Sequence, residues 1–338
     1  MAIKNKSELR QDIVSGDWIL LAPGRLRGKI DFAKKNQKRI IMSRKTCPFE
    51  LPFQNVNNQV LIGYTDVKNM GGWGKYQLLV LENKFPAVRH PSGSIREIKK
   101  GPFQIMPGVG HHDLLITRDH HKNFAGISRG GAHDIFKAFA ERYKQVSADK
   151  EIAYVSIFHN WGPRAGASVY HPHYQIMSIP VIPPDVGHSL AGSQRYFRAK
   201  HRCAHCDMIT WEKKERSRII VENDKAIAFA PFVSRNPFEV RVFPKRHLPY
   251  FEDSSEADRD SVADVLQRAL QKITKKMHDP DYNFFIHTAP TQKKNIYKHY
   301  HWHIEVYPKF SIRAGFEFGT GIEMNTVDPD FAAKILCG

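Results

Sequence analysis

Apolar and polar residues follow two recurring patterns along this chain. Short runs of β-branched and aromatic residues, bounded by Pro, Gly and Asn, predict strands; Tyr76-Gln-Leu-Leu-Val-Leu81 and Glu239-Val-Arg-Val-Phe243 are two of them. Residues 132–146 and 256–277 carry apolar residues at helical spacing and predict two amphipathic helices. Because the strands come in runs with few helices between them, the pattern favours an α+β fold with antiparallel sheets.

The order of these signals occurs twice. The first series begins at Cys47-Pro-Phe-Glu50 and ends at His171-Pro-His-Tyr-Gln175, and the second runs from Cys203-Ala-His-Cys206 to His301-Trp-His-Ile-Glu305. A period of about half the chain predicts two related halves, each an antiparallel sheet with one main helix. We place them at residues 1–185 and 186–338, with 183–189 as the linker region. One undivided domain with accidental similarity is the alternative.

Composition narrows the class of protein. The chain has 338 residues, enough for one large domain or two ordinary ones, and 41% of them are apolar. No run approaches the roughly 18 apolar residues of a membrane span, and the N-terminus lacks the apolar region of a secretory signal. Four cysteines do not make a disulfide scaffold. These features predict a cytoplasmic protein without a membrane segment.

The net charge of +17 indicates what kind of ligand the protein attracts. A field of this sign favours anionic ligands, either phosphorylated small molecules or nucleic acid. An ordinary basic surface explains the same charge equally well. The 18 histidines are more informative, because many of them fall in short clusters.

One histidine cluster lies on a predicted strand. Side chains alternate between the two faces of a strand, so His171, His173 and Gln175 share one face while Tyr174 points to the other. Beside a bound phosphate, a neutral imidazole can attack the α-phosphorus of a nucleotide and form a phosphoramidate. The amide of Gln175 can hydrogen-bond a phosphoryl oxygen but cannot act as an acid, which favours transfer to a phosphate-bearing acceptor over hydrolysis. The alternative is a solvent-facing strand with inert histidines.

The segment before this strand suits a phosphate. It reads Asn160-Trp-Gly-Pro-Arg-Ala-Gly-Ala-Ser168, and its small residues let backbone N–H groups approach phosphate oxygens. Arg164 adds a guanidinium, which matches the geometry of phosphate. The candidate phosphate-binding residues are Asn160, Gly162, Arg164, Gly166 and Ser168.

The motif His171-Pro-His-Tyr-Gln175 resembles the active-site motif of the galactose-1-phosphate uridylyltransferases, within the histidine-triad superfamily. Residues 10–25 are similar to that family's N-terminal segment. Residues 160–168, 315–321 and 328–333 resemble the plant-type ADP-glucose phosphorylase branch. The resemblance covers nearly the whole chain and implies a homodimer, ping-pong kinetics and a nucleotide-sugar substrate. One departure is Trp161, which stands where the family usually has Gln.

The resemblance also implies roles for particular residues. We take His173 as the nucleophile and Gln175 as its catalytic partner. Asn83 and Phe85 lie where the family holds the base, and Arg25 belongs to the similar N-terminal segment. Neither the base, uracil or adenine, nor the sugar follows from these residues.

Two zinc sites are predicted. The family's structural zinc carries over to Cys47, His120 and His171, with Glu50 in place of the second cysteine; zinc accepts carboxylate as well as thiolate and imidazole. The alternative is that this site is lost and that His171 only supports the fold. The histidines 111, 112 and 121 compete for the place of His120. In the second half, a Cys₂His₂ set offers a closed tetrahedral site, which indicates a structural role. A redox pair is the alternative, and His299, His303 and Glu305 are accessory ligands. The second set consists of Cys203, Cys206, His247 and His301.

Three functions remain open at this point. The leading hypothesis is nucleotidyl transfer between a nucleotide sugar and a sugar 1-phosphate, of the UDP-glucose:hexose-1-phosphate type. The second is phosphorolysis of a nucleotide sugar by inorganic phosphate, of the ADP-glucose phosphorylase type. The third is a basic RNA-binding protein on a decayed enzyme fold. Intact His173 and Gln175, and the lack of an aromatic RNA-recognition motif, make nucleic acid an unlikely partner.

Overall fold

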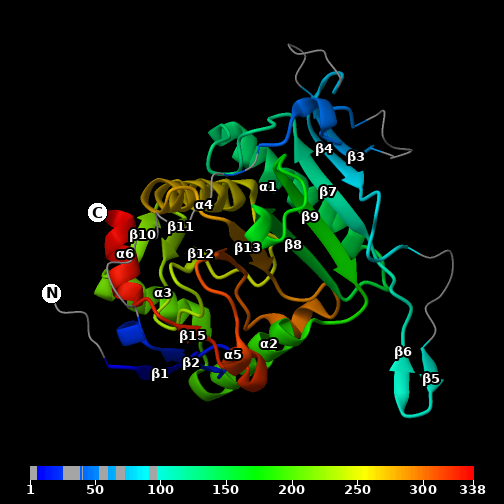
Figure 1. Ribbon diagram of the computed structural model, residues 1–338. Helices are drawn as coiled ribbons and strands as arrows, with labels where there is room; N and C mark the ends of the chain where they lie inside the picture. The colour runs from blue at the N-terminus through cyan, green and yellow to red at the C-terminus, as the bar shows by residue number, and fades with distance from the viewer. Residues whose placement is uncertain (1–5, 26–38, 40, 53–59, 66–72, 91–96) are drawn as a thin grey trace.

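A ten-stranded antiparallel sheet forms the centre of the molecule in the computed structural model (Figure 1). The structure describes residues 6–25, 39, 41–52, 60–65, 73–90 and 97–338. The strand order is β10-β11-β12-β14-β13-β8-β9-β7-β4-β3. The α+β fold expected from the runs of strands is confirmed.

Each half of the chain supplies five consecutive strands of this sheet. The first half gives β3 (Val60–Thr65), β4 (Tyr76–Glu82), β7 (His112–Thr117), β8 (Tyr154–Trp161) and β9 (His173–Ile179). The second half gives β10 (Ile219–Glu222), β11 (Ala226–Phe229), β12 (Val240–Pro244), β13 (Tyr282–His287) and β14 (His303–Pro308).

The two halves meet where β8 pairs with β13. Phe158 lies opposite Phe285, and the pairs on either side, Ile157 with Ile286 and His159 with Phe284, are arranged symmetrically about it. This register makes β8 the counterpart of β13 and β9 the counterpart of β14. The two predicted sheets are therefore joined edge to edge, which removes one exposed edge from each.

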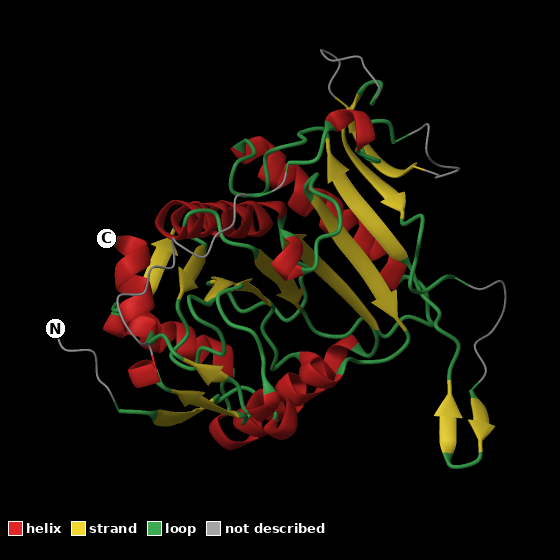
Figure 2. Ribbon diagram, viewed as in Figure 1, coloured by secondary structure: helices red, strands yellow, loops and turns green. Residues whose placement is uncertain are grey.

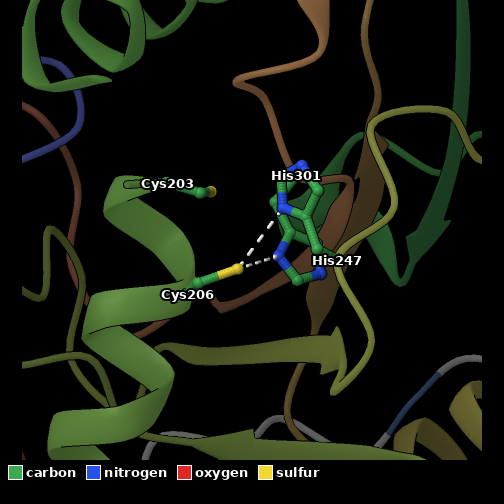
Figure 3. Close-up of side chains that lie close together, drawn as sticks. All are labelled: Cys203, Cys206, His247 and His301. Carbon is green, nitrogen blue, oxygen red and sulfur yellow. Dashed lines mark hydrogen bonds between the residues drawn. The ribbon is translucent and has the colours of Figure 1, made fainter. Parts of the chain in front are cut away.

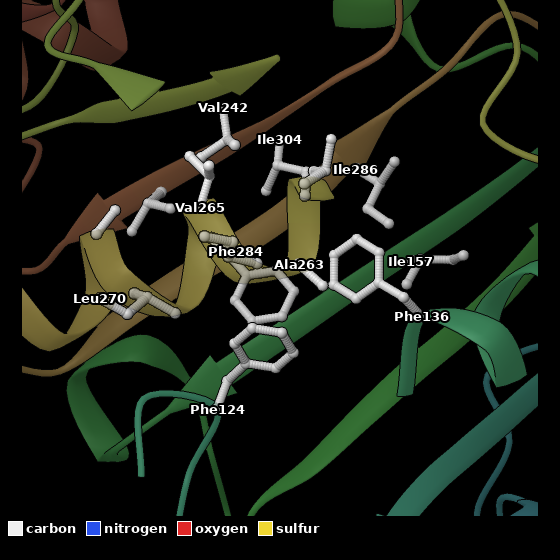
Figure 4. Close-up of a cluster of buried hydrophobic side chains, with 14 of the residues drawn as sticks. Phe124, Phe136, Ile157, Val242, Ala263, Val265, Leu270, Phe284, Ile286 and Ile304 are labelled. Atoms are coloured by element: carbon white, nitrogen blue, oxygen red, sulfur yellow. The ribbon is translucent and has the colours of Figure 1, made fainter. Parts of the chain in front are cut away.

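Two long helices cover one face of the sheet. They are α1 (Arg129–Ser147) and α4 (Glu256–Met277), close to the predicted ranges. Each begins at a serine whose side chain accepts a backbone N–H of the first turn, Ser128 from Gly131 and Ser255 from Asp258, which satisfies a donor that the helix cannot. The helices contact each other and bury a continuous core against both halves of the sheet (Figure 4).

The segment 183–189, expected as a linker, is instead the start of a helix. Helix α2 (Pro184–Lys200) has proline at its first position and Asp185 in its first turn. Proline has the helical φ already and lacks a donor that would be unpaired there, so this pair of prolines starts a helix rather than a free connection. Helix α3 (Ala204–Glu215) follows directly and packs Ile209 against Phe229 and Phe243.

The N-terminal strands lie against the second half of the chain. β1 (Glu8–Gln11) and β2 (Trp18–Leu21) form a small sheet with β15 (Met324–Asn325), which runs parallel to β2. Arg10 donates to the carbonyl of Phe232 at 2.8 Å, and Gly192 of α2 packs so closely on Val14 that a Cβ would lie 1.8 Å from its carbonyl oxygen. A division of the chain at residue 185 remains a prediction.

The remaining elements are short. A hairpin of β5 (Ile98–Lys100) and β6 (Phe103–Ile105) projects from the body (Figure 2). Among the described helices, none combines the length and the apolar content that crossing a membrane requires. The others are α5 (Gly315–Thr320), α6 (Pro329–Cys337) and the 3-10 turns η1 (Pro23–Arg25), η2 (Arg44–Thr46), η3 (Pro163–Ala165) and η4 (Lys294–Tyr297).

Candidate functional site

Strand β9 begins at His173, so His173, Tyr174 and Gln175 alternate between the faces as predicted, whereas His171 lies just before the strand. Tyr174 points into the core, where its ring lies 5.6 Å from that of Phe139. His173 and Gln175 point to the face of the sheet opposite α1 and α4, which we call the site face. The motif is built into the central sheet, so its side chains are held by strand pairing on both sides.

The imidazole of His173 is arranged as a nucleophile. Its Nδ1 donates to the carbonyl of His171 at 3.0 Å, so the neutral ring keeps its lone pair on Nε2. Burial lowers the pKa of His173 below its usual value, because a charged ring is disfavoured away from water. Phe49 approaches the ring edge-on, with the centroids 5.3 Å apart. The ring is therefore oriented and neutral, the form in which it can attack phosphorus.

A second histidine holds the backbone of the nucleophile. His159 of β8 is fully buried, and its Nδ1 donates to the carbonyl of His173 at 2.7 Å. Burial lowers the pKa of His159 to about 3, so it stays neutral in this role. This hydrogen bond could not be predicted from the sequence, because it depends on the register between β8 and β9.

The small-residue loop turns sharply after β8. Gly162 and Gly166 have φ values of 87° and 88°, which L-residues with side chains rarely adopt. Asp281 accepts the backbone N–H of Arg164 at 2.8 Å, and Asn283 donates to Asn160 at 2.7 Å. The loop is thus fixed by residues of the second half, a contribution the sequence analysis missed.

We expect Gly162→Ala to disrupt this loop more than Gly166→Ala. Both variants place a side chain at a positive φ, which destabilises the folded state by about 1–2 kcal/mol. At Gly162 alone, the new Cβ would also lie 2.0 Å from an Asp281 carboxylate oxygen, whereas at Gly166 the nearest atom is 3.8 Å away. Thermal melting and turnover measured on both variants check this. Equal losses would show that the Asp281 contact does not fix the loop.

Arg164 points away from the buried part of the site. Its side chain is exposed and lines a cavity of about 420 Å³ that is formed mainly by the second half, together with His303 and Glu305. Asn160, Gly166 and Ser168 lie at or near the surface of the loop. The structure therefore brings the loop to the end of β8 beside β9, with its arginine turned towards the β13–β14 side.

The predicted base-binding residues follow β4. Phe85 is 79% exposed, and its N–H donates to the side chain of Asn83 at 3.0 Å. Asn83 Nδ2 lies 3.2 Å from His112, which contacts Gln175 at 2.9 Å. The loop is thus connected to the catalytic strand. Arg25, by contrast, is the last residue of the 3-10 turn that follows β2, a strand of the small sheet.

The first predicted metal group comes together as expected. The ligand atoms of Cys47, Glu50, His120 and His171 all lie within 4.8 Å of one another. His120 and His171 each donate Nε2–H to a backbone carbonyl, at 2.9 and 2.7 Å, so Nδ1 of each neutral ring carries a lone pair. That lone pair of His120 faces a Glu50 oxygen at 2.7 Å, and neither atom has a hydrogen-bond partner among the described residues. A cation between these two acceptors would satisfy both.

The second predicted group is built in the same way (Figure 3). Cys206 Sγ lies 3.3 Å from Nδ1 of His247 and 3.5 Å from Nδ1 of His301, and Cys203 completes the group. Both histidines again donate Nε2–H to carbonyls, at 2.8 and 3.0 Å. Hydrogen bonding from Cys206 lowers the pKa of the Cys203 thiol. Two sulfurs and two imidazoles with second-sphere carbonyl partners fit Zn²⁺.

The residues considered as competing ligands lie in different environments. His299 donates to the carbonyl of Leu190 at 3.3 Å, outside the cysteine group. His303 and Glu305 lie on β14 with His287 of β13 nearby, and their ligand atoms form a third group within 4.8 Å. By the symmetry of the sheet these three correspond to His173, Gln175 and Asn160. Histidines 111, 112 and 121 lie outside the first group.

Comparisons with known proteins agree with this geometry. Residues 1–183 match the family model for the galactose-1-phosphate uridyl transferase N-terminal domain, and residues 105–336 match a domain of unknown function, DUF4921. An ADP-glucose phosphorylase of Arabidopsis thaliana is 32% identical over 99% of this chain and 94% of its own length. A galactose-1-phosphate uridylyltransferase of Thermotoga maritima is 25% identical over 97% of each chain. The crystal structure of an Arabidopsis thaliana ADP-glucose phosphorylase with bound ADP-glucose is similar with a TM-score of 0.79, 29% identity and 98% coverage of both chains.

Proposed function

Because this chain belongs to the galactose-1-phosphate uridylyltransferase family and is a nucleotidyl-transferring enzyme, we propose that it transfers a nucleotidyl group from a nucleotide sugar to a phosphate-bearing acceptor. The leading acceptor is a sugar 1-phosphate, and the group is carried on His173. One observation carries the proposal: His173 is a buried, neutral imidazole whose Nδ1 is bound to a carbonyl and whose Nε2 keeps the lone pair.

The reaction has two balanced steps. In the first, His173 Nε2 forms a bond to the α-phosphorus, the bond from that phosphorus to the sugar phosphate breaks, and sugar 1-phosphate leaves with the electron pair. In the second, a phosphate oxygen of the acceptor attacks the same phosphorus and His173 leaves as a neutral ring. Gln175 holds a phosphoryl oxygen by hydrogen bonding in both steps. Neither step needs a general acid, because sugar phosphate is a good leaving group in the first step and His173 leaves as a neutral ring in the second.

The second candidate function is phosphorolysis, in which inorganic phosphate replaces the sugar 1-phosphate in the second step. The 32% identity to an ADP-glucose phosphorylase over nearly the full length of both chains favours it. The chemistry at His173 is the same in both cases. The acceptor and the base distinguish them. RNA binding on a decayed fold is disfavoured by the oriented nucleophile.

Two further properties belong to the proposal. Zinc bound at the Cys203 group would hold loops against strand ends. Zinc at the Cys47–Glu50 group, where a carboxylate replaces a thiolate, would do the same. Neither group lies among the reacting atoms. The protein would act in the cytoplasm, as its composition predicts, and as a homodimer, as the family resemblance implies. Because the zinc ligand His171 lies two residues before the nucleophile His173, metal bound at the first group would couple to the position of the nucleophile.

A screen of donors and acceptors tests the function. UDP-glucose and ADP-glucose are each incubated alone, with galactose 1-phosphate and with inorganic phosphate. We expect slow release of glucose 1-phosphate from a donor alone, because Gln175 cannot activate water. A phosphate-bearing acceptor should raise turnover manyfold, with parallel-line kinetics. Fast hydrolysis that no acceptor changes would instead place the chain with hydrolases.

A further inference from the structure

His112 lies between the catalytic strand and the loop after β4. It is the first residue of β7, next to β9 in the sheet. Its Nε2 lies 2.9 Å from Gln175 Oε1 and 3.2 Å from Asn83 Nδ2, and its Nδ1 lies 3.1 Å from the backbone nitrogen of Ala87. The ring is partly buried and lies outside both predicted zinc groups. Neither the sequence motif nor the family match assigns it a role.

The contacts fix which nitrogen carries the proton. The backbone N–H of Ala87 can only donate, so Nδ1 of the neutral His112 ring must accept. The proton is then on Nε2, which donates to Gln175 Oε1 at 2.9 Å. In this tautomer Nε2 offers no lone pair to Asn83, whose own Oδ1 accepts the N–H of Phe85. The two N–H bonds of the Asn83 amide stay available to another acceptor.

The same hydrogen bond orients the amide of Gln175. With Oε1 held by His112, the Gln175 NH₂ is the end that remains to bind a phosphoryl oxygen. The opposite orientation would place the lone pairs of Oε1 towards the phosphate and would repel it. An amide free to flip would spend part of its time in the wrong orientation, so fixing it favours the transition state.

We infer that His112 is a positioning residue for the nucleotidyl transfer: it orients the Gln175 amide towards phosphate and links that amide to the loop of Asn83 and Ala87. The inference rests on the proposed function. It also means that a base bound against Asn83 and Phe85 contacts the same loop whose Ala87 N–H fixes the His112 ring. The residue makes no contact with the reacting atoms itself.

A matched pair of substitutions tests the role. His112→Gln places an amide that can donate to Gln175, and His112→Glu places a carboxylate of the same size that cannot donate at neutral pH. The single-turnover rate of His173 nucleotidylation is measured at saturating nucleotide sugar. We expect His112→Glu to lower that rate by about 10–100-fold, as is usual for loss of an orienting partner. His112→Gln should recover most of it, with little change in KM between the pair.

The same pair is then placed in a Gln175→Ala background. If His112 acts through Gln175, the Glu and Gln variants should differ by less than about 2-fold there, because the partner is gone. An equal difference in both backgrounds would overturn the role of His112. So would a change confined to KM. Failure of the proposed function is distinct, because it would appear as wild-type protein that carries no nucleotide on His173. Melting temperature and zinc content, measured on every variant, identify any that is misfolded.

Discussion

Replacing His173 with alanine is expected to abolish covalent labelling by nucleotide sugar and to lower turnover by at least ~10³-fold, the scale on which loss of a covalent nucleophile acts. The side chain is the one group that the proposed reaction uses to form a bond to phosphorus. Its removal deletes the hydrogen bond to the His171 carbonyl but leaves the hydrogen bond from His159 to the His173 carbonyl in place. Initial rates with the best donor and acceptor pair measure the effect.

A matched control uses a histidine on the opposite side of the sheet. His133 of α1 pairs with Asp264 of α4 at 2.8 Å and belongs to the helical layer that covers the face opposite His173. His133→Ala should keep full labelling and turnover. If His173→Ala retained normal turnover while remaining folded, the covalent mechanism would be wrong.

Cys203→Ser is expected to reduce bound zinc by about one equivalent and to destabilise the fold by more than ~4 kcal/mol. Binding free energy at a structural zinc site is folding free energy, and loss of a metal is among the few causes of effects this large. The group joins the start of α3 to the ends of β12 and the segment before β14. Elemental analysis and denaturant unfolding measure the two quantities.

The exposed Cys337 supplies the control for the metal measurement. Cys337→Ser should leave zinc content and unfolding free energy within about 0.5 kcal/mol of the wild type, as for most surface substitutions. Purified protein that contains no zinc and is fully stable would refute the structural role. Equal zinc content in Cys203→Ser would show that the metal is bound elsewhere.

Local sequence patterns predicted much of the site. Alternation along a strand predicted that His173 and Gln175 share one face and that Tyr174 points to the other. The family resemblance and the repeated order of motifs predicted the two sets of residues whose ligand atoms lie together. These features depend on side chains close in sequence or on matched positions in two halves. The helical spacing over 256–277 agrees with α4 to its ends.

Contacts that depend on strand register could not be predicted from the sequence. His112 was considered only as a rival zinc ligand, because nothing local shows that β7 pairs with β9 so as to bring it to Gln175. The role of Asp281 in fixing the glycine loop depends in the same way on the pairing of β8 with β13. The helix after Pro183 was not predicted, because residues 183–189 were assigned to the linker region, whereas proline at the first position suits a helix start.

The most direct test of the central claim is the mass of the intact protein after brief incubation with nucleotide sugar and no acceptor. The account predicts an added mass of one nucleotidyl group, located on the peptide that contains His173, labile in acid and stable in base. Addition of sugar 1-phosphate or inorganic phosphate should remove it. Steady turnover by wild-type protein that never carries such an adduct, even when the reaction is quenched within a single turnover, would contradict the account.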